Sequence, residues 1–556
     1  MASARITSGL DISDAGTTSI PASDYRPTLE TIPIELLTEI LGYLKHNKNH
    51  LCATSLVSKK LHVASTPLLY ETVILKFSEL TRESSPQYDS LTCQQHRAVH
   101  HVRVFGLKGY YRESRSNMHE ADLQKRDYNF RIVSWLMLGV LRQFKFNQLR
   151  EFVWHTDVHL MDLIARDLKA FQKSLKGLWI ARPGPQPDGA LHNCLFEMLE
   201  QDAFELNSFQ LVGFDRPGEF PRGLRFFVSL KDQLTTFIFH PTDRSFTRSL
   251  KARAHLWEYQ YPGKTMKFSN VKFLSLNIID DDFFSKVQSI SKFFDINKLR
   301  TLHLGQVRKI TRTLGILRKA KIQLKEFHLT GIVDPDVLDD FLASFSGLQE
   351  LRLDVECDGD RFKEIVELKT HSATLLRLFT RIQDKRFYSP GGQWFIRLLQ
   401  ENYVFPQLME IGLSGSFDYL DEIRAGGKGM PKLQLLWIMA HPRNWMDGGL
   451  EFSELHAFLR PLFRKTSDIG PRWPFVAIGT GTGSLRDWPK IFELCESVTI
   501  SGEIATTLSY VTHRDLFDHN PDLTLLQSAS HRLPWQEERE FTKSQPKSDF
   551  DSKYYF

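Results

Sequence analysis

A glycine-rich segment at 479–483 (GTGTG) has the composition of a loop that could cradle a phosphate group. A dinucleotide-binding fingerprint would need another glycine at the position of Ser484, and the Gly-Lys-Ser/Thr ending of a nucleotide-binding P-loop does not follow. The segment therefore predicts a turn after a strand and not a nucleotide site.

Alternating acidic residues, Asp354, Glu356 and Asp358, are followed by a glycine, as at the start of a calcium-binding loop. Such a loop needs a bidentate glutamate at its twelfth position, where this chain has Ile365. We therefore expect a solvated acidic loop after a strand that begins near Leu348.

Two histidines, His155 and His159, are spaced to share one face of a helix, but no H-E-x-x-H zinc motif accompanies them, so we expect surface histidines. The segment 412–416 (GLSGS) misses the G-x-S-x-G nucleophile motif by one residue. Because no nucleophile, base and orienting residue can be recognised together, the sequence predicts a non-enzymatic protein with no catalytic residue, metal ligand or cofactor.

A six-residue pattern, apolar-x-x-apolar-x-apolar, recurs along most of the chain. Its instances begin at Leu149, Leu175, Leu206, Leu234, Val271, Leu299, Leu324, Leu348, Leu375, Leu408 and Leu433. Successive starts are 24 to 37 residues apart, and hexamers at Val99, Trp473 and Cys495 could extend the series. Eleven instances at such spacing indicate a repeat architecture.

Alternation within each hexamer predicts a short strand with one buried face, and segments between hexamers, such as 282–294 and 336–345, have apolar residues at helical spacing. A strand and a helix about every 28 residues resemble the leucine-rich repeat, whose units stack into a solenoid with parallel strands inside. We expect an α/β fold with an irregular leucine-rich-repeat solenoid. The alternative architecture is a doubly wound α/β enzyme with fewer, longer strands.

If the apolar residues of each hexamer face inward, the interleaved residues form a central row on the opposite face of the sheet. We expect His303, His328 and Arg352 on adjacent strands, with Glu326 and Glu350 in the next row. Three aromatic side chains of the central row would be exposed, unless loops or the C-terminal tail cover them. The candidate substrate-binding residues are Trp179, His303, His328, Arg352, Phe379 and Trp437.

Composition limits the function further. Lys and Arg total 71 against 66 Asp and Glu in 556 residues, so the net charge of +5 gives no reason to expect nucleic-acid or membrane binding. Five cysteines lie far apart without a C-x-x-C pair, and the longest nearly apolar run, 132–141, is too short to span a membrane. We expect a reduced cytoplasmic or nuclear protein, and 41 phenylalanines predict much buried aromatic volume.

Residues 29–75 predict three short helices. Apolar residues at spacings of three and four share one helix face, and they are Ile32, Leu36, Leu37, Ile40, Leu41 and Leu44. Pro33 suits the first helical turn, and Leu51, Val57 and Leu61 belong to the following helical pieces. Because about 45 residues cannot bury a sufficient core, this apolar stripe must dock on the rest of the chain or on a partner.

This segment resembles the F-box, with the pattern L-P-x-E-[LI]-x-x-x-I-[LF]-x-x-L followed by a Leu and V-[CS]-[KR]-x-[WF]. The matching residues are Ile32, Pro33, Glu35, Leu36, Ile40, Leu41, Leu44, Leu51, Val57, Ser58 and Lys59. The ending at 67–71 (PLLYE) is similar to that of fungal F-box proteins, while Leu61 and His50 replace the usual aromatic and acidic residues.

The resemblance implies the substrate-receptor subunit of an SCF (Skp–cullin–F-box) ubiquitin ligase. Its adaptor-binding residues would be Ile32, Pro33, Leu36, Leu37, Ile40, Leu41, Leu44, Leu51, Val57 and Leu61, which would dock on a Skp-type adaptor and through it a cullin. The solenoid would bind a protein substrate. The alternatives are a scaffold that binds the adaptor outside a ligase, and an α/β enzyme.

We therefore expect six regions along the chain. They are a disordered N-terminal segment (1–28), the F-box (29–75), a connecting region with room for a first repeat (76–148), the solenoid (149–505), a C-terminal cap (506–531) and a polar tail (532–556).

Overall fold

The computed structural model describes a large part of the chain. The described residues are 29, 31–45, 48–80, 88, 91, 97–109, 120–156, 158, 160–181, 204–214, 230–241, 267–277, 293–308, 310–357, 366–384, 393–414, 429–439, 475–478, 490–498, 504–511, 516 and 523. They belong to two compact units, Met1–Leu69 and Tyr70–Phe556. Residues 70–75, which we expected to belong to the F-box, therefore lie in the second unit.

The first unit is helical. It contains α1 (Ile34–Gly42), α2 (Lys48–Ser55) and α3 (Lys59–Tyr70, which continues one residue past the division). Pro33 is the N-cap residue of α1, where its missing N–H is not needed, and Glu35 in the first turn complements the positive end of the helix. The small core of this unit consists of Leu37, Leu41, Leu51, Leu61 and Ala64.

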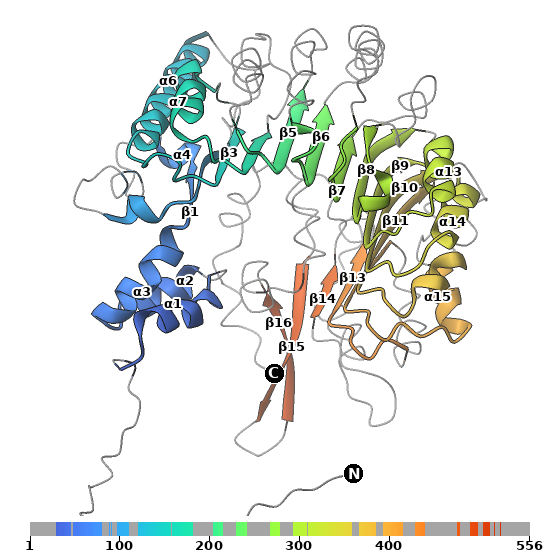
Figure 1. Ribbon diagram of the computed structural model, residues 1–556. Coiled ribbons are helices and arrows are strands. Elements are labelled where there is room, and N and C mark those ends of the chain that lie inside the picture. Colours follow the sequence, from blue (N-terminus) through green and yellow to red (C-terminus); the bar gives the residue numbers. More distant parts are fainter. Residues whose placement is uncertain are drawn as a thin grey trace, which may run out of the picture. The chain divides into compact units, whose positions relative to one another are not determined.

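The second unit is an α/β structure built on one sheet of 16 strands, in which every strand pairs with its neighbours in sequence order (Figure 1). The strands are β1 (Thr72–Lys76), β2 (Val104–Gly109), β3 (Glu151–Thr156), β4 (Gly177–Ala181), β5 (Ser208–Phe214), β6 (Thr236–Pro241), β7 (Phe273–Asn277), β8 (Thr301–Arg308), β9 (Glu326–Ile332), β10 (Glu350–Cys357), β11 (Arg377–Asp384), β12 (Glu410–Ser414), β13 (Leu435–Met439), β14 (Phe475–Ile478), β15 (Lys490–Val498) and β16 (Ile504–Val511). The pairs from β1 to β14 are parallel, and those from β14 to β16 are antiparallel.

Helices connect several of these strands. They are α4 (Phe77–Leu80), α6 (Glu120–Leu141), α7 (Asp162–Phe171), α13 (Thr311–Lys319), α14 (Pro335–Ala343) and α15 (Gln393–Gln400), with 3-10 turns η1 (Arg97–His101), η4 (Ile296–Lys298) and η5 (Val366–His371). Apolar residues of α6, α7, α13, α14 and α15 share one hydrophobic cluster with the strands, so these helices cover one face of the sheet. In the described part of the chain, no helix is long and apolar enough to cross a membrane.

The register of the parallel strands places the fourth residue of each hexamer in one continuous row. This row, which we call the first core row, consists of Val73, Phe105, Phe152, Leu178, Phe209, Phe237, Leu274, Leu302, Phe327, Leu351, Leu378, Ile411, Leu436 and Val476. The sixth residues form a second core row two positions further along. The predicted strands from Leu149 to Leu433, the extension at Trp473 and the helix at 336–345 are therefore confirmed.

Two of the extensions are wrong. The repeat before Leu149 uses Val102, Phe105 and Leu107, because Val102 is buried and β2 begins at Val104, so the hexamer is three residues later than Val99 suggested. The segment at Cys495 lies in β15, but this strand is antiparallel to β14 and pairs with β16. A first strand, β1, was not recognised from the sequence at all.

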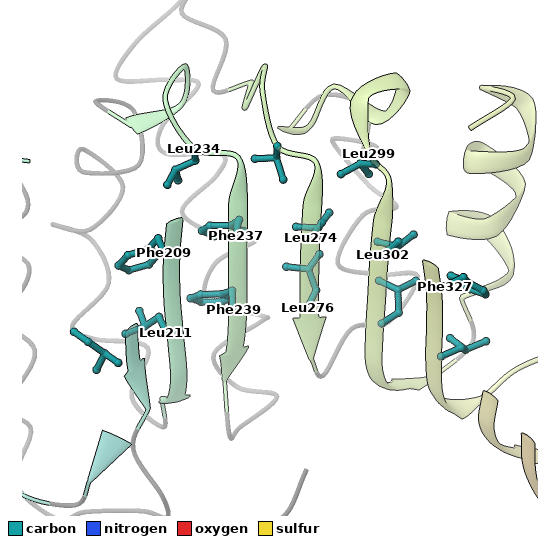
Figure 2. Close-up of a cluster of buried hydrophobic side chains, with 14 of the residues drawn as sticks. Phe209, Leu211, Leu234, Phe237, Phe239, Leu274, Leu276, Leu299, Leu302 and Phe327 are labelled. Carbon is teal, nitrogen blue, oxygen red and sulfur yellow. The ribbon is translucent and has the colours of Figure 1, made fainter. Parts of the chain in front are cut away.

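Phenylalanine fills much of the core, as its abundance predicted. The ring centroid of Phe237 lies 6.2 Å from that of Phe209 and 6.1 Å from that of Phe239, and these three side chains are labelled in Figure 2. It also lies 5.4 Å from the ring centroid of Phe268. Phe268 in turn stacks on Phe294 at 5.3 Å. Such pairs contribute about 0.5–1.5 kcal/mol each beyond the area that they bury.

One position of the second core row is polar. Thr380 replaces the leucine or isoleucine of the neighbouring strands, its side chain is fully buried, and its hydroxyl has no hydrogen-bond partner within the described residues. A buried hydroxyl without a partner keeps its full desolvation penalty. This position explains why the hexamer at Leu375 departs from the pattern.

We predict that Thr380→Val raises the free energy of unfolding by about 1 kcal/mol, because a methyl group replaces the unsatisfied hydroxyl at nearly the same volume. The matched control is Thr374→Val. The hydroxyl of Thr374 donates to the carbonyl of Leu348 at 2.8 Å, so this change should lower stability. Urea unfolding midpoints measure both, and a destabilised Thr380→Val variant would contradict the prediction.

Candidate functional site

Helix α1 has one broad apolar side, divided into an inner and an outer face that lie about 100° apart around the helix axis. Its inner face contains Leu37 and Leu41, which are buried in the core of the first unit. Its outer face contains Leu36, Ile40 and Tyr43, spaced at i, i+4 and i+7, with 50%, 54% and 85% of their surface exposed. The core of the unit covers the inner face only, and exposed neighbouring apolar side chains indicate a surface that packs against another element. The outer face of α1 is therefore a candidate binding surface.

More apolar side chains of this unit are exposed after α2 and on α3. They are Leu56, Val57 and Val63. A small domain that exposes several large apolar residues within 30 positions indicates an interaction surface. Cys52 on α2 is a free, exposed thiol.

The ten predicted adaptor-binding residues fall into two groups. Those that are buried or half-buried inside the unit are Leu37, Leu41, Leu51, Leu61, Ile32 and Leu44, and those that are exposed are Pro33, Leu36, Ile40 and Val57. The apolar residues of α1 share one broad side of the helix, as expected, but packing within the unit covers only part of it. At 100° per residue, Leu36 and Ile40 lie about 100° around the helix axis from Leu37 and Leu41.

The second candidate surface is the face of the sheet opposite the core rows, between β8 and β12. The register confirms that His303, His328 and Arg352 lie on adjacent strands. It also confirms that Glu326 and Glu350 are paired in the next row. We call these residues, with Asp354, Arg377, Arg381 and Glu410, the sheet-face network.

Ion pairs join the sheet-face network across the strands. His328 Nε2 lies 2.8 Å from Glu350 Oε1, and Arg377 lies 3.6 Å from Glu350 and 2.8 Å from Glu410. Glu410 is fully buried and Glu350 is 7% exposed, so these pairs are shielded from solvent. Removing one partner of such a pair leaves a buried charge, which is strongly destabilising.

Stacking contacts complete the network. The imidazole rings of His303 and His328 lie face to face with centroids 3.7 Å apart, and Phe273 contacts His303 edge-on at 4.9 Å. The guanidinium of Arg352 lies 5.1 Å from the ring centroid of Phe379. On the next row, Arg381 donates to Asp354 at 2.7 Å.

The environment shifts the two neighbouring glutamates in opposite directions. Burial and the adjacent Glu350 carboxylate raise the pKa of Glu326 above its ordinary value. Burial also opposes ionisation of Glu350, but the hydrogen bond and charge of His328 and the charges of Arg352 and Arg377 outweigh it and lower its pKa. Glu326 accepts a hydrogen bond from the hydroxyl of Thr301 at 3.2 Å.

Half of the predicted substrate-binding residues are not accessible. Phe379 and Trp437 are 4% and 1% exposed, and Arg352 is 2% exposed, so the expectation of exposed Phe379 and Trp437 is wrong. Leu516 and Leu523 share a hydrophobic cluster with Phe379 and Trp437, together with Ile491 of β15. The C-terminal part of the chain thus covers this end of the sheet face.

The other three predicted substrate-binding residues, Trp179, His303 and His328, are half-buried and therefore partly accessible to solvent. Trp179 donates from Nε1 to Glu151 Oε2 at 3.0 Å. Gly177 permits this contact, because a Cβ there would lie 2.8 Å from Trp179 Nε1 and 2.9 Å from Glu151 Cγ.

Two predictions made from sequence motifs, the acidic loop at Asp354 and the surface histidine His155, are wrong. Asp354 lies within strand β10, is 6% exposed and pairs with Arg381, so it is not part of a solvated loop. His155 lies in strand β3 and is 8% exposed, so it is neither helical nor on the surface. His159, Asp358, the glycine-rich segment 479–483 and residues 282–292 of the helical segment expected at 282–294 lie outside the described residues.

Within the described residues, no group of three or more His, Cys, Asp or Glu side chains is arranged to hold a metal ion. No protein-family model matches the chain, and no curated protein matches it either.

We predict opposite effects of two equivalent substitutions in the sheet-face network. Because the folded pKa of Glu326 is raised, its ionisation destabilises the folded state as the pH rises, and Glu326→Gln should increase the free energy of unfolding at pH 7 by about 0.5 kcal/mol. Below about pH 4 this gain should vanish, since the carboxyl is then protonated in both states.

Glu350→Gln is the control, one strand away. The folded pKa of Glu350 is lowered, so its contribution is present at neutral pH and disappears as the pH falls through that pKa. We expect a loss of about 3 kcal/mol at pH 7 that shrinks toward acid pH. Urea unfolding at pH 4 and pH 7 measures both variants, and effects of the same sign would contradict the pKa shifts.

Proposed function

We propose that this protein is the substrate-receptor subunit of an SCF-type ubiquitin ligase. Residues 29–69 act as an F-box that docks on a Skp-type adaptor, and the following repeats form an irregular leucine-rich-repeat solenoid that binds a protein substrate. The observation that carries the proposal is the exposed outer face of α1, Leu36, Ile40 and Tyr43, in a segment with the F-box pattern.

Helix α1 supports adaptor docking by its energetics. Leu36 and Ile40 each leave about half of their surface in water although the adjacent face of the same helix is already buried. Covering the exposed half of such a side chain is worth about 1 kcal/mol, half of the value for full burial. The residues that match the F-box pattern have two roles. Leu41 and Leu51 are buried and hold the three helices together. Leu36, Ile40 and Val57 are exposed and would contact the adaptor.

The sheet supports a leucine-rich-repeat solenoid over a doubly wound enzyme. The fourteen strands β1 to β14 are parallel and follow one another in chain order. Each repeat contributes one strand and the connection to the next strand. A doubly wound sheet reverses its strand order at a switch point, where its ligand binds. The order from β1 to β14 contains no such reversal, and stacked repeats produce this order without further assumptions.

Such a subunit would work by proximity. It holds a substrate near the ubiquitin-transfer chemistry of the other subunits, which raises the effective concentration of the acceptor lysine. No catalytic side chain is required in this chain. The alternative, an adaptor-binding scaffold outside a ligase, shares the docking face and differs only in that no cullin joins the complex.

We predict that the double substitution Leu36→Asp and Ile40→Asp abolishes co-purification of the Skp-type adaptor. Two charges placed in a dry interface would weaken binding by more than about 100-fold, since each unpaired buried charge costs several kcal/mol. The measurement is a pull-down with the full-length chain, probed for the adaptor and for the cullin.

The matched control is Phe146→Asp with Phe171→Asp. These side chains are 61% and 51% exposed and belong to the second unit, so the control adds the same charge without touching α1. It should retain the adaptor. Undiminished adaptor binding by the α1 variant would refute the docking proposal, and an adaptor complex that never contains cullin would favour the scaffold.

A further inference from the structure

Basic residues line the edge of the sheet where the parallel strands begin. The residue just before each strand accepts two backbone hydrogen bonds from the next strand, as Arg103 O does from Arg150 N at 2.7 Å and Glu151 N at 3.1 Å. This pattern repeats across the sheet, so these residues form one ladder. From β2 to β9 its members are Arg103, Arg150, Lys176, Asn207, Thr235, Lys272, Arg300 and Lys325.

Six of these eight successive positions are therefore cationic, in two groups of three adjacent strands. We call the six the basic ladder. Arg150, Lys272, Arg300 and Lys325 are exposed, and Arg103 and Lys176 are partly exposed. The row of cations ends on both sides. The equivalent position before β1 is Glu71, whose carbonyl accepts from Arg103 N, and the equivalent position before β10 is the uncharged Gln349.

The connections add charge of the same sign beside the ladder. Lys145 and Lys173 are exposed next to Arg150 and Lys176, where Asn147 N donates to Phe171 O at 2.7 Å and so holds the two connections together. Within the described residues, Glu205 forms a salt bridge with Lys176, and the Glu326 carboxylate interacts electrostatically with Lys325. The six cations of the ladder outnumber these two carboxylates, although the net charge of the whole chain is only +5.

Like charges on neighbouring strands lie about 4.8 Å apart and destabilise a sheet. The basic ladder places four pairs of cationic residues on neighbouring strands, two pairs in each group of three. A bound polyanion would relieve this repulsion, because each cation would then face an opposite charge.

We propose that the basic ladder binds an acidic segment of a protein partner, one rich in carboxylates and lying across the starts of β2 to β9. Eight strands at this spacing span about 34 Å, which matches roughly ten residues of an extended chain. Binding is electrostatic, so it weakens with salt.

A protein segment fits this edge better than a single-stranded nucleic acid. Nucleic-acid grooves pair their cations with aromatic side chains on which successive bases stack. The exposed aromatic side chains on the described part of this edge are Phe146 and Phe171, both near β3 and β4, and the starts of β5 to β9 have none. The inference does not depend on adaptor docking, because the ladder belongs to the second unit alone.

The test uses the full chain and a fluorescently labelled twelve-residue oligoglutamate as the probe, with fluorescence anisotropy at low salt. The ladder variant is Arg150→Gln, Lys272→Gln and Lys325→Gln, three exposed positions. We expect about tenfold weaker binding, since three screened charge pairs are lost. Thermal melting of this variant should occur at an equal or higher temperature, because repulsion is removed.

The control variant, Arg131→Gln, Arg166→Gln and Lys319→Gln, removes the same charge from exposed positions on α6, α7 and α13. It should bind the probe within about twofold of the unmodified chain. Equal affinity of the ladder variant and the unmodified chain would overturn the proposal. A second result would also overturn the proposal. If a twelve-nucleotide oligothymidine binds more tightly than oligoglutamate at the same salt, and the ladder variant no longer binds the oligothymidine, the ligand is a nucleic acid.

Discussion

The stacked apolar rows beneath the parallel sheet are the interaction on which the second unit depends. A single strand with two or three inward apolar residues cannot bury them alone, and each repeat covers the residues of its neighbours. Phe152, Phe209 and Phe237 of the first core row are 0%, 0% and 6% exposed, and the helices α7, α13 and α14 close the same core from the side. Because the contribution of each strand exists only if its neighbours are in register, the register is fixed along the whole sheet. This common register makes the other faces and edges of the sheet predictable as ladders.

The opposite face of the sheet follows different rules, because its rows are not required to be apolar. Between β8 and β12 it carries a charge network in which Glu350 and Glu410 both contact Arg377. Further along, Phe379 and Trp437 replace the charged residues, and Leu516 and Leu523 cover them. In the same row Arg352 is already only 2% exposed, so this face becomes inaccessible before the charged residues are replaced by the aromatic ones of the second core. A partner that reaches this face would meet His303, His328 and Glu326 and not the buried aromatic residues.

Periodicity predicted the strands because burial acts on every hexamer in the same way. It predicted the adjacency of His303, His328 and Arg352 for the same reason, since equal positions in successive hexamers must be neighbours on a parallel sheet. It failed where contacts come from distant segments: the burial of Trp437 depends on residues about 80 positions later, and no local pattern encodes that. It also failed at Val99, where two overlapping apolar patterns compete and only packing selects Val102. On α1, the apolar residues share one broad side, and only packing within the unit determines that Leu37 and Leu41 are buried while Leu36 and Ile40 are exposed.

The net charge of the chain did not indicate how its charged residues are distributed over the surface. A net charge of +5 over 556 residues indicates a nearly neutral protein, and it gave no reason to expect an anionic partner. The repeat places one residue of each unit at the same edge, so a modest bias at one position becomes a row of Arg103, Arg150 and Lys176 and another of Lys272, Arg300 and Lys325. The electrostatic potential at a surface depends on how the charges are arranged. Parallel strands lie about 4.8 Å apart, so equivalent residues of neighbouring repeats are closer together than the Debye length at physiological salt. In repeat proteins, charge should therefore be counted by position in the repeat, because only then does the sequence reveal which edge can attract a ligand.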